Sequence, residues 1–356
     1  MLTEANAELS SNVVAVDLFC GIGGLTHGLI QAGISVVAGV DTDPTCRFAY
    51  ESNNRRTRFV QKSVTDISAD ELARWYPKGK VRILVGCAPC QPFSNYTNRY
   101  PRDERWSLLY SFRELVAGVR PDVVSMENVP ELAQRNHKVY SDFVSSLKEL
   151  GYFVESSVVR CADYGVPQRR SRLVLLASLR GPVSLIPPTH PKSRWLTVRH
   201  AIGYLPPIVA GGKPVSGDAL HVASRLSAIN LKRIRATPEG GGWKDWPRAL
   251  RLACHLKESG SQYLSVYGRM SWDELAPTMT TQCYGLGNGR FGHPVQDRAI
   301  SLREAALLQT FPPSYRFVPP DERVTFRHTG KHIGNSVPVA LAKAIGVSIV
   351  RHLQQA

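Results

Sequence analysis

Two cysteines and two prolines stand close together in the segment Gly86–Ser94, which reads GCAPCQPFS and follows the apolar run Ile83–Val85. A Cys-x-x-Cys pair can form a redox centre, but the proline and the polar residues that follow favour a loop over a helix. A structural zinc site would need a second such pair, and the sequence has none. Two interpretations stay open: Cys90 is a nucleophile at a strand end, or it is a buried structural thiol.

A glycine-rich pattern in the segment Val16–Leu25, VDLFCGIGGL, is typical of a turn between a strand and a helix. Glycines let the backbone approach a ligand, and a helix N-terminus offers free N–H groups to an anion. Asp41 ends the next apolar run, where an acid accepts ribose hydroxyls in nucleotide-binding sheets. Asp66 ends another short segment and suits an adenine amino group. The pattern favours a nucleoside cofactor over a tight turn without a ligand.

Charged side chains mark two further strand ends. Glu127 lies in MENVP, directly after an apolar run, and is either a proton donor and acceptor or a solvated acid. The segment Gln168–Arg172, QRRSR, leads into the next apolar run, and Arg170 and Arg172 share one face of an extended chain. Two guanidiniums in register suit a phosphate or a polar base edge. A charged sheet edge is the alternative.

Apolar runs alternate with helical patterns in the first half of the chain, as in a parallel α/β sheet. The expected strands are Val13–Leu18, Ile34–Val40, Val81–Val85, Asp122–Met126 and Leu173–Ala177. The expected helices are Leu25–Ala32, Trp106–Val119, Tyr140–Leu150, Leu302–Thr310 and Pro338–His352. Gly33 and Gly151 follow two of these segments and predict helix ends. The sequence therefore predicts a doubly wound α/β sheet, whose carboxyl edge collects the segments described above.

An irregular region extends from residue 181 to about residue 292, with glycine clusters, prolines and no clean periodicity. It predicts a second domain. Its basic residues Lys232, Arg233 and Arg235 stand near Trp243 and Trp246, which suits contact with a nucleic acid. A solvated basic face is the alternative.

The whole chain of 356 residues carries a net charge of +15, from 44 Lys and Arg against 29 Asp and Glu. Such an excess favours an anionic partner, and the lack of a basic amphipathic helix favours nucleic acid over a membrane surface. No apolar run approaches the ~18–20 residues that cross a bilayer, and the N-terminal residues do not read as a signal peptide. Seven dispersed cysteines favour reduced thiols. We expect a cytoplasmic protein.

The order and spacing of DLFCGIGG, Asp41, GCAPCQPFS, MENVP and QRRSR resemble the motifs of the DNA (cytosine-5) methyltransferase family. The similarity continues in PTMTT from Pro277, in Arg298 with SLREA, in LQTFP, and in IGNSVP from Ile333. It covers about residues 13 to 352, with only the stretch near 187–275 unmatched. Two departures are Thr42, where many relatives have a bulkier side chain, and His332, where glutamine is common.

The resemblance implies a bacterial enzyme of the restriction-modification type that flips a cytosine out of duplex DNA and methylates its carbon 5. Cys90 would attack carbon 6 of the base, and Glu127 would hydrogen-bond or protonate ring nitrogen 3. Arg172 would help to hold the base, and Arg170 would lie close to the phosphates. The recognised sequence would be short and specific, and no metal would be needed.

The resemblance also implies S-adenosylmethionine as the methyl donor. The expected binding residues are Phe19, Gly21, Gly23, Asp41, Asp66, Pro89, Leu108 and Asn335, with Phe19 stacked on adenine. The segment Gln91–Arg105 would be a loop that closes over the flipped base, with Gln91 and Ser94 at the DNA. Lys232, Arg233 and Arg235 would grip the phosphates.

The catalytic domain would comprise residues 1–186 plus 329–356, and a smaller, irregular target-recognition domain residues 187–328. The protein would be a monomer associated with the nucleoid, beside a restriction endonuclease that acts separately. A tRNA methyltransferase is one alternative, although the second domain lacks the Cys-Phe-Thr tripeptide usual in that branch. A catalytically silent DNA-binding regulator is the other, and the intact Cys90, Glu127 and Arg172 argue against it.

Overall fold

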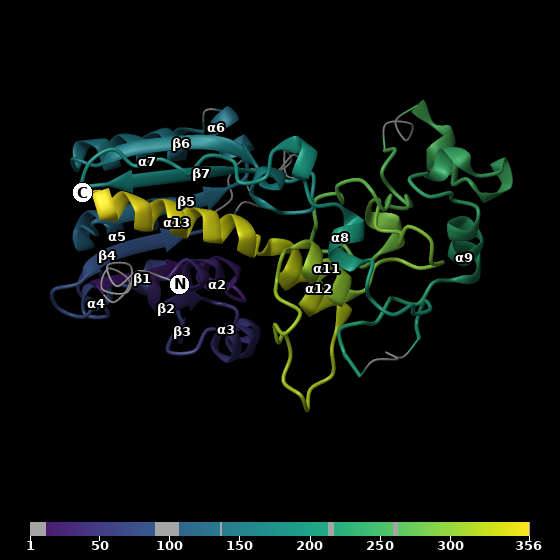
Figure 1. The fold of residues 1–356 in the computed structure, drawn as a ribbon, viewed down its shortest axis with the longest axis horizontal. Coiled ribbons are helices and arrows are strands. Elements are labelled where there is room, and N and C mark those ends of the chain that lie inside the picture. Colours follow the sequence, from purple (N-terminus) through teal and green to yellow (C-terminus); the bar gives the residue numbers. More distant parts are fainter. Residues whose placement is uncertain (1–11, 90–106, 136, 213–216, 259–262, 356) are drawn as a thin grey trace. The chain divides into compact units, whose positions relative to one another are not determined.

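The computed structural model describes residues 12–89, 107–135, 137–212, 217–258 and 263–355. The chain forms two compact units (Figure 1). Unit 1 comprises Met1–Arg160, Ser171–Thr189 and Val337–Ala356, and unit 2 comprises Cys161–Arg170 and His190–Ser336. The functional assignment of 1–186 plus 329–356 and of 187–328 stays a prediction.

Unit 1 is built on a seven-stranded sheet with the order β3-β2-β1-β4-β5-β7-β6 (Figure 1). The strands are β1 Val13–Leu18, β2 Ser35–Asp41, β3 Arg58–Gln61, β4 Val81–Gly86, β5 Val123–Asn128, β6 Phe153–Arg160 and β7 Ser171–Ser178. Strands β1 to β5 are parallel, and β7 is antiparallel to both β5 and β6. The chain proceeds outward from β1 in both directions, so the predicted α/β fold with a doubly wound sheet is confirmed.

Two strands and one strand direction were not predicted from the sequence. β3 has only four residues, and β6 is an edge strand whose residues are exposed or half-buried, so neither has a buried apolar run. β7 runs antiparallel because only residues 161–170 connect it to β6, and a parallel pair needs a crossover of a dozen or more residues. The sheet is therefore mixed.

Helices cover the sheet in two groups. The helices of unit 1 are α2 Gly24–Gln31, α3 Arg47–Asn53, α4 Ala69–Ala73, α5 Ser107–Val119, α6 Glu131–Gln134, α7 Lys138–Glu149 and α13 Val339–Gln355. Helices α4, α5 and α7 pack on one another in sequence and share a core with Val14, Val16 and Leu18 of β1. α2 packs against α13, where a Cβ at Gly28 would collide with Ala342.

Unit 2 has no β-strand among its described residues, only isolated bridges such as Arg269 to Gly292. Its helices are α8 Val198–Ile202, α9 Ala228–Arg235, α11 Leu302–Leu308 and α12 Phe326–Asn335. The buried guanidinium of Arg269 donates to the main-chain oxygens of Thr237, Ile234 and His293. A single side chain thus satisfies carbonyl groups that a strand would satisfy in a regular domain.

One stretch of the described residues, 326–355, is long enough to cross a membrane and contains an 18-residue segment that is apolar enough by composition, with a mean hydropathy of 1.6. It consists of two helices, α12 and α13, which are separated by Ser336, Val337 and Pro338. Most of the stretch is buried inside the protein. A core helix passes the same test, so the stretch is weak evidence for a membrane span.

Candidate active site

The carboxyl ends of the parallel strands bring several predicted site residues to one edge of the sheet. Four segments lie there: residues 19–23 after β1, Asp41 at the end of β2, residues 87–89 after β4 and Glu127 near the end of β5. The register pairs Leu18 with Gly86 and Gly86 with Met126, so these strands end level with one another. Open sheets of this kind bind their ligands at this edge.

Glu127 is buried at this edge and is contacted from both neighbouring strands. Its side chain is only 2% exposed. Cys87 Sγ donates a hydrogen bond to Oε2 at 2.8 Å, and Arg172 Nε lies 2.9 Å from Oε1 as an ion pair. No donor among the described residues makes a hydrogen bond of good geometry to Oε1. A buried oxygen without a donor calls for an explanation, and a ligand that supplies one is such an explanation.

The sheet register accounts for this meeting of three side chains. Gly86 pairs with Met126 in the parallel β4–β5 ladder, so Cys87 comes level with Glu127 on the same face. Glu127 pairs with Val174 in the antiparallel β5–β7 ladder, and Arg172 is the diagonal neighbour two residues away. Glu127 and Arg172, two predicted catalytic residues, are therefore brought together.

The glycine-rich turn after β1 has left-handed backbone conformations at Phe19, Gly21 and Gly23, with φ of 60°, 50° and 90°. Asp41 anchors this turn, because its Oδ2 accepts the Gly21 N–H and its Oδ1 accepts the Asp43 N–H, each at 2.9 Å. A Cβ on Gly21 would meet no protein atom within 4 Å. Asp41 thus fixes the turn on one side, and the side toward which a Cβ of Gly21 would point is open. This arrangement fits the expected nucleoside group of S-adenosylmethionine.

A buried carboxyl lies under the turn. Asp17 Oδ2 accepts a hydrogen bond from Thr26 Oγ1 at 2.6 Å, and Thr26 Oγ1 lies 3.1 Å from Tyr50 Oη. Asp17 Oδ1 has no hydrogen-bond partner in the described part of the chain. Burial raises the pKa of Asp17 to about 7. Sequence reasoning did not single out Asp17, although a carboxyl inside the apolar run VVAVDL was a visible signal.

The other four expected cofactor residues are spread over several elements of the two units. Asp66 is exposed in a short 3₁₀ turn, and Pro89 and Leu108 are half-buried in unit 1. Asn335 is the last residue of α12, in unit 2. Their roles in cofactor binding stay predictions.

Gln168 and Arg170 lie in unit 2, where they hold the PTMTT segment. Gln168 Oε1 accepts the Met279 N–H at 2.8 Å, and its Nε2 donates to the Leu308 oxygen at 2.6 Å. Arg170 is buried and donates to the oxygens of Met279 and Ser336. In this structure the Arg170 guanidinium is therefore engaged with the main chain, and its expected contact with phosphates stays a prediction.

Cys90, Gln91 and Ser94 lie outside the described residues, as does the expected loop Gln91–Arg105. The other six cysteines form no disulfide in the described part of the chain. The roles of Cys90, Gln91 and Ser94 stay predictions.

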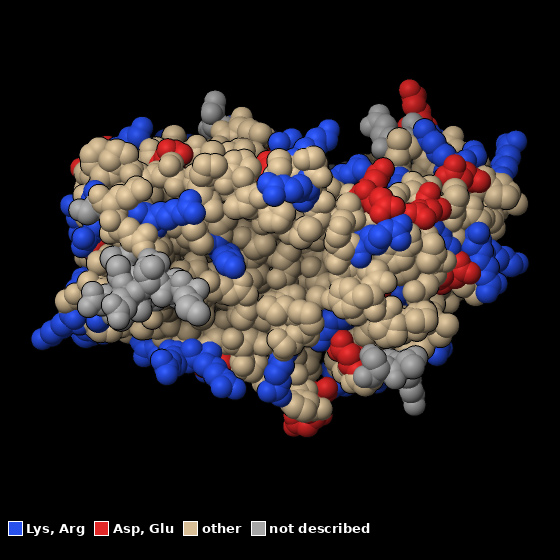
Figure 2. Space-filling model, viewed as in Figure 1, with Lys and Arg blue, Asp and Glu red and all other residues tan. Residues whose placement is uncertain are grey.

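The three basic residues proposed at the DNA differ in exposure. Lys232 and Arg235 are exposed on α9, whereas Arg233 is buried and donates to the Leu250 oxygen and to Asn230. Figure 2 shows Lys and Arg side chains spread widely over the face drawn, rather than in one patch.

The two tryptophans expected beside these basic residues are buried, so neither is presented to a base. Trp243 stacks on His255 with ring centroids 4.4 Å apart, and the Trp246 indole donates to Thr237 Oγ1 at 2.7 Å. The sequence suggested that these tryptophans and the basic residues near them contact a nucleic acid, but both indoles are packed inside unit 2. Sequence alone does not show whether a tryptophan in an aperiodic segment points inward.

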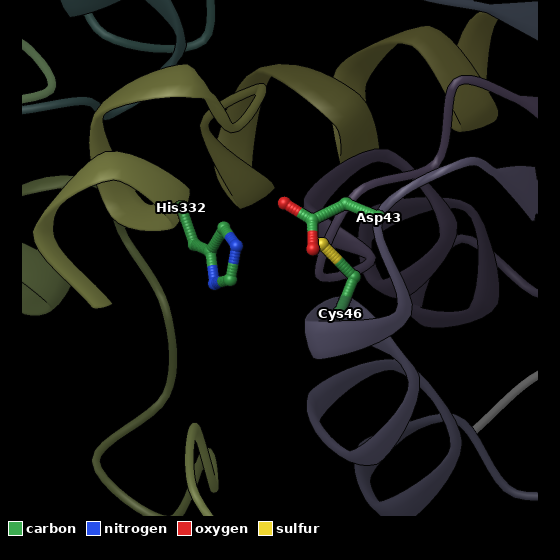
Figure 3. A group of neighbouring side chains, drawn as sticks. All are labelled: Asp43, Cys46 and His332. Carbon is green, nitrogen blue, oxygen red and sulfur yellow. The ribbon is translucent and has the colours of Figure 1, made fainter. Parts of the chain in front are cut away.

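A thiol, a carboxylate and an imidazole, which are common metal ligands, are drawn in Figure 3. Asp43 and Cys46 belong to a 3₁₀ turn in unit 1, where Asp43 Oδ1 accepts the Thr45 N–H at 3.1 Å. His332 belongs to α12 of unit 2. Since these residues come from two separately described units, we assign them no metal site.

Comparison with known proteins gives a consistent result. A family model described as C-5 cytosine-specific DNA methylase matches residues 13–351. The Type II methylase M.HgiDII of Herpetosiphon aurantiacus is 55% identical over 340 residues, which cover 95% of each chain. The Type II methyltransferase M.XorII of Xanthomonas oryzae pv. oryzae is 31% identical and covers 96% of this chain and 85% of its own.

Among solved structures, an E. coli prophage-encoded chain described as a DNA modification methyltransferase superposes with a TM-score of 0.74. It covers 96% of this chain and 99% of its own, at 23% identity, and this similarity supports the fold. The family model and the 55% identical relative together establish the assignment. The chain belongs to the C-5 cytosine-specific DNA methylase family, as a DNA (cytosine-5) methyltransferase of the bacterial restriction-modification type.

Proposed function

We propose that this enzyme flips a cytosine out of a specific short duplex sequence and methylates carbon 5 through a covalent bond to Cys90. The observation that carries the proposal is the buried Glu127 at the carboxyl edge of the sheet. Its neighbour Arg172 neutralises its charge, and its Oε1 has no hydrogen-bond donor among the described residues. The GCAPC motif that ends in Cys90 begins at the adjacent strand end.

The proposed reaction requires a thiolate and an acid that act on the same cytosine. Cytosine is a poor electrophile, so addition of the Cys90 sulfur to carbon 6 needs relief of the negative charge that develops on the ring. Glu127 provides it by hydrogen bonding or by transferring a proton to nitrogen 3. Carbon 5 then becomes nucleophilic and takes the methyl group. A base such as water then takes the carbon 5 proton, and the carbon 6–sulfur bond breaks with its electron pair going to Cys90. Glu127 recovers any proton that it gave to nitrogen 3, so the aromatic ring, the thiolate and the acid are all restored.

S-adenosylmethionine supplies the electrophilic methyl group in this proposal. Phe19 and the open turn at Gly21 would hold its adenosine, and Asp41, fixed by two backbone N–H groups, would accept the ribose hydroxyls. Asp41 can accept the backbone N–H groups and the ribose hydroxyls at the same time, because each carboxylate oxygen accepts more than one hydrogen bond.

Contacts with the DNA backbone offset the cost of removing the base from the stack. Flipping costs a few kcal/mol in stacking and pairing. We propose Lys232 and Arg235, exposed on α9, among the phosphate contacts. The protein is proposed to act as a cytoplasmic, nucleoid-associated monomer beside a separate restriction endonuclease.

The test is capture of the covalent intermediate. A duplex library with 5-fluorocytosine has no proton to lose at carbon 5, so the enzyme should stay bonded to its target in the presence of S-adenosylmethionine. We expect a denaturation-resistant complex with the wild type and none with Cys90→Ala. Sequencing of the captured duplexes would give the recognised site.

The same assay separates the alternatives. A tRNA methyltransferase would label transcripts and leave duplex DNA unmodified. A silent regulator would retain duplex DNA equally in the wild type and in Cys90→Ala, without a covalent complex. Either result would contradict the proposal.

A further inference from the structure

The thiol of Cys87 stands at the proposed acid, and neither the family motif nor the mechanism above gives it a task. Cys87 is half-buried and follows directly on β4. Its backbone N–H donates to the Leu18 oxygen at 3.3 Å, which continues the β1–β4 ladder by one residue. The backbone position of Cys87 is thus fixed by the sheet, and its side chain lies on the same face as Glu127.

The Glu127 carboxylate has few partners for a buried group. Within the described residues, the Cys87 thiol provides its only hydrogen bond, at 2.8 Å to Oε2. Arg172 Nε is 2.9 Å from Oε1 and neutralises charge, but the N–H is not aligned to donate. Arg172 instead donates from Nη1 to the Ser171 oxygen at 2.8 Å. An ion pair without an aligned hydrogen bond restricts the rotation of the carboxylate less than an aligned hydrogen bond does.

We propose that Cys87 is a positioning residue, which fixes the rotation of the Glu127 carboxylate so that Oε1 is the oxygen presented to the cytosine. The thiol donates a hydrogen bond to Oε2 but does not transfer its proton, so Oε2 stays a hydrogen-bond acceptor throughout the reaction. Any proton exchanged with nitrogen 3 then passes through Oε1. This inference rests on the proposed function, because it assumes that Glu127 acts on the base.

A space-filling role and a donor role predict different results for substitutions. Cys87→Ala and Cys87→Val both remove the donor, and valine leaves no hole. Cys87→Ser keeps a hydroxyl donor in nearly the same place. If the residue only fills space, valine should be tolerated and serine should offer no advantage over alanine. If it orients Glu127, serine should preserve activity and the other two should not.

The experiment measures the single-turnover rate of methyl transfer, the Kd for duplex DNA and the thermal midpoint of each variant. We expect Cys87→Ala and Cys87→Val to lower the rate about 10- to 100-fold, the effect of losing one hydrogen bond to a charged group. The Kd should stay near wild type, and the thermal midpoint should fall by no more than about 10 °C, because a single hydrogen bond is lost. Cys87→Ser should remain within about threefold of wild type. Cys254→Ala, which removes an exposed thiol, is the matched control and should be unchanged.

A double-mutant cycle tests whether Cys87 acts through Glu127. In the Glu127→Gln background, Cys87→Ala should cause no further loss of rate, because the carboxylate that it orients is absent. The positioning role is overturned if the two losses multiply, or if serine is as poor as alanine. It is also overturned if the alanine and valine variants keep the wild-type rate, or if neither folds.

Failure of the proposed function gives a different pattern. Glu127→Gln would then methylate as fast as the wild type, or the wild type would not methylate cytosine at all. When wild type and Glu127→Gln behave as proposed and only the Cys87 variants stay neutral, the positioning role alone is wrong.

Discussion

Two buried glutamate–arginine pairs in this enzyme differ in the hydrogen bonds that hold the carboxylate. In unit 2, Arg298 donates from Nη1 and Nη2 to the two oxygens of Glu304, each at 2.7 Å, and the Ser301 N–H adds a third bond at 2.6 Å. In unit 1, Glu127 has an arginine at 2.9 Å without an aligned hydrogen bond, and a single thiol donor. Both glutamates are almost fully buried.

The difference separates a carboxylate that stabilises the fold from one that is available for chemistry. Burial alone would raise the pKa of Glu304, but the hydrogen bonds and charge of Arg298 outweigh it and keep that pKa below its usual range. Glu304 also closes the capping box at the start of α11 with Ser301. Both oxygens of Glu304 accept hydrogen bonds within the protein, whereas Oε1 of Glu127 has no hydrogen-bond donor among the described residues.

The largest effect should come from Glu127→Gln. Glutamine keeps the volume of the side chain but cannot transfer a proton, so the rate of methyl transfer should fall about 10²- to 10⁴-fold. The free energy of unfolding should fall by no more than about 1–2 kcal/mol, because the introduced glutamine can still accept the bond from Cys87 and Arg172, 12% exposed, keeps its bond to the Ser171 oxygen. Single-turnover methylation and urea denaturation measure the two quantities. A large loss of stability with normal activity would reverse the comparison.

Arg298→Met should produce the opposite result. It leaves the buried Glu304 carboxylate without its arginine, which should lower the free energy of unfolding by about 3–5 kcal/mol. Activity per folded molecule should stay within about threefold of wild type, because a buried pair that is satisfied within the fold has no acceptor left for substrate. Removing the carboxylate as well, in Arg298→Met with Glu304→Leu, should restore much of the stability. Urea denaturation measures the free energy of unfolding of both variants. An additive loss in the double variant would contradict the prediction.

A third buried carboxyl, Asp17, has no arginine partner among the residues that the structure describes, so it can be compared with the two glutamates. Its pKa is raised to about 7 by burial, so the folded protein binds a proton that the unfolded chain releases near pH 4. The stability that this proton contributes is complete below about pH 4 and is lost as the pH rises toward 7, by about 1.4 kcal/mol per pH unit. Asp17→Asn removes this dependence. The thermal midpoint of the variant should gain on wild type between pH 5 and pH 7, and parallel curves would contradict the account.

The smallest effect should come from the basic residues of α9. Lys232→Ala and Arg235→Ala each remove one proposed phosphate contact and should reduce the slope of log Kd against log salt by about one. Arg233→Ala should leave that slope unchanged and instead destabilise unit 2, because its buried guanidinium bonds the Leu250 oxygen. Fluorescence anisotropy at several salt concentrations measures the slopes. Equal slopes for all three variants would show that exposure does not distinguish them.

The sequence predicted the elements that have a one-sided or continuous apolar pattern. β1, which is buried along its whole length, was placed to the residue, and β4, β5 and β7 were placed within a few residues. β3 and β6 could not be predicted, because edge strands of mixed exposure have no such pattern. The direction of β7 depends on the length of the connection before it rather than on its own residues.

The candidate site was predictable residue by residue but not as a geometry. Glu127 and Arg172 were singled out separately, and their contact follows from the pairing of β5 with β7. Cys87 was considered only as half of a Cys-x-x-Cys pair, because its partner Glu127 is 40 residues away in the chain. Arg233, Trp243 and Trp246 were expected on a surface, and only tertiary packing shows that they face inward.

The contact between α2 and α13 has a consequence for the synthesis of the protein. α2 follows β1 near the start of the described residues, and α13, which covers it at Gly28 and Ala342, is made much later during synthesis. A nascent chain therefore lacks the support behind the turn at residues 19–23 until α13 has left the ribosome. We expect no methylation of DNA by nascent chains from which α13 is still missing.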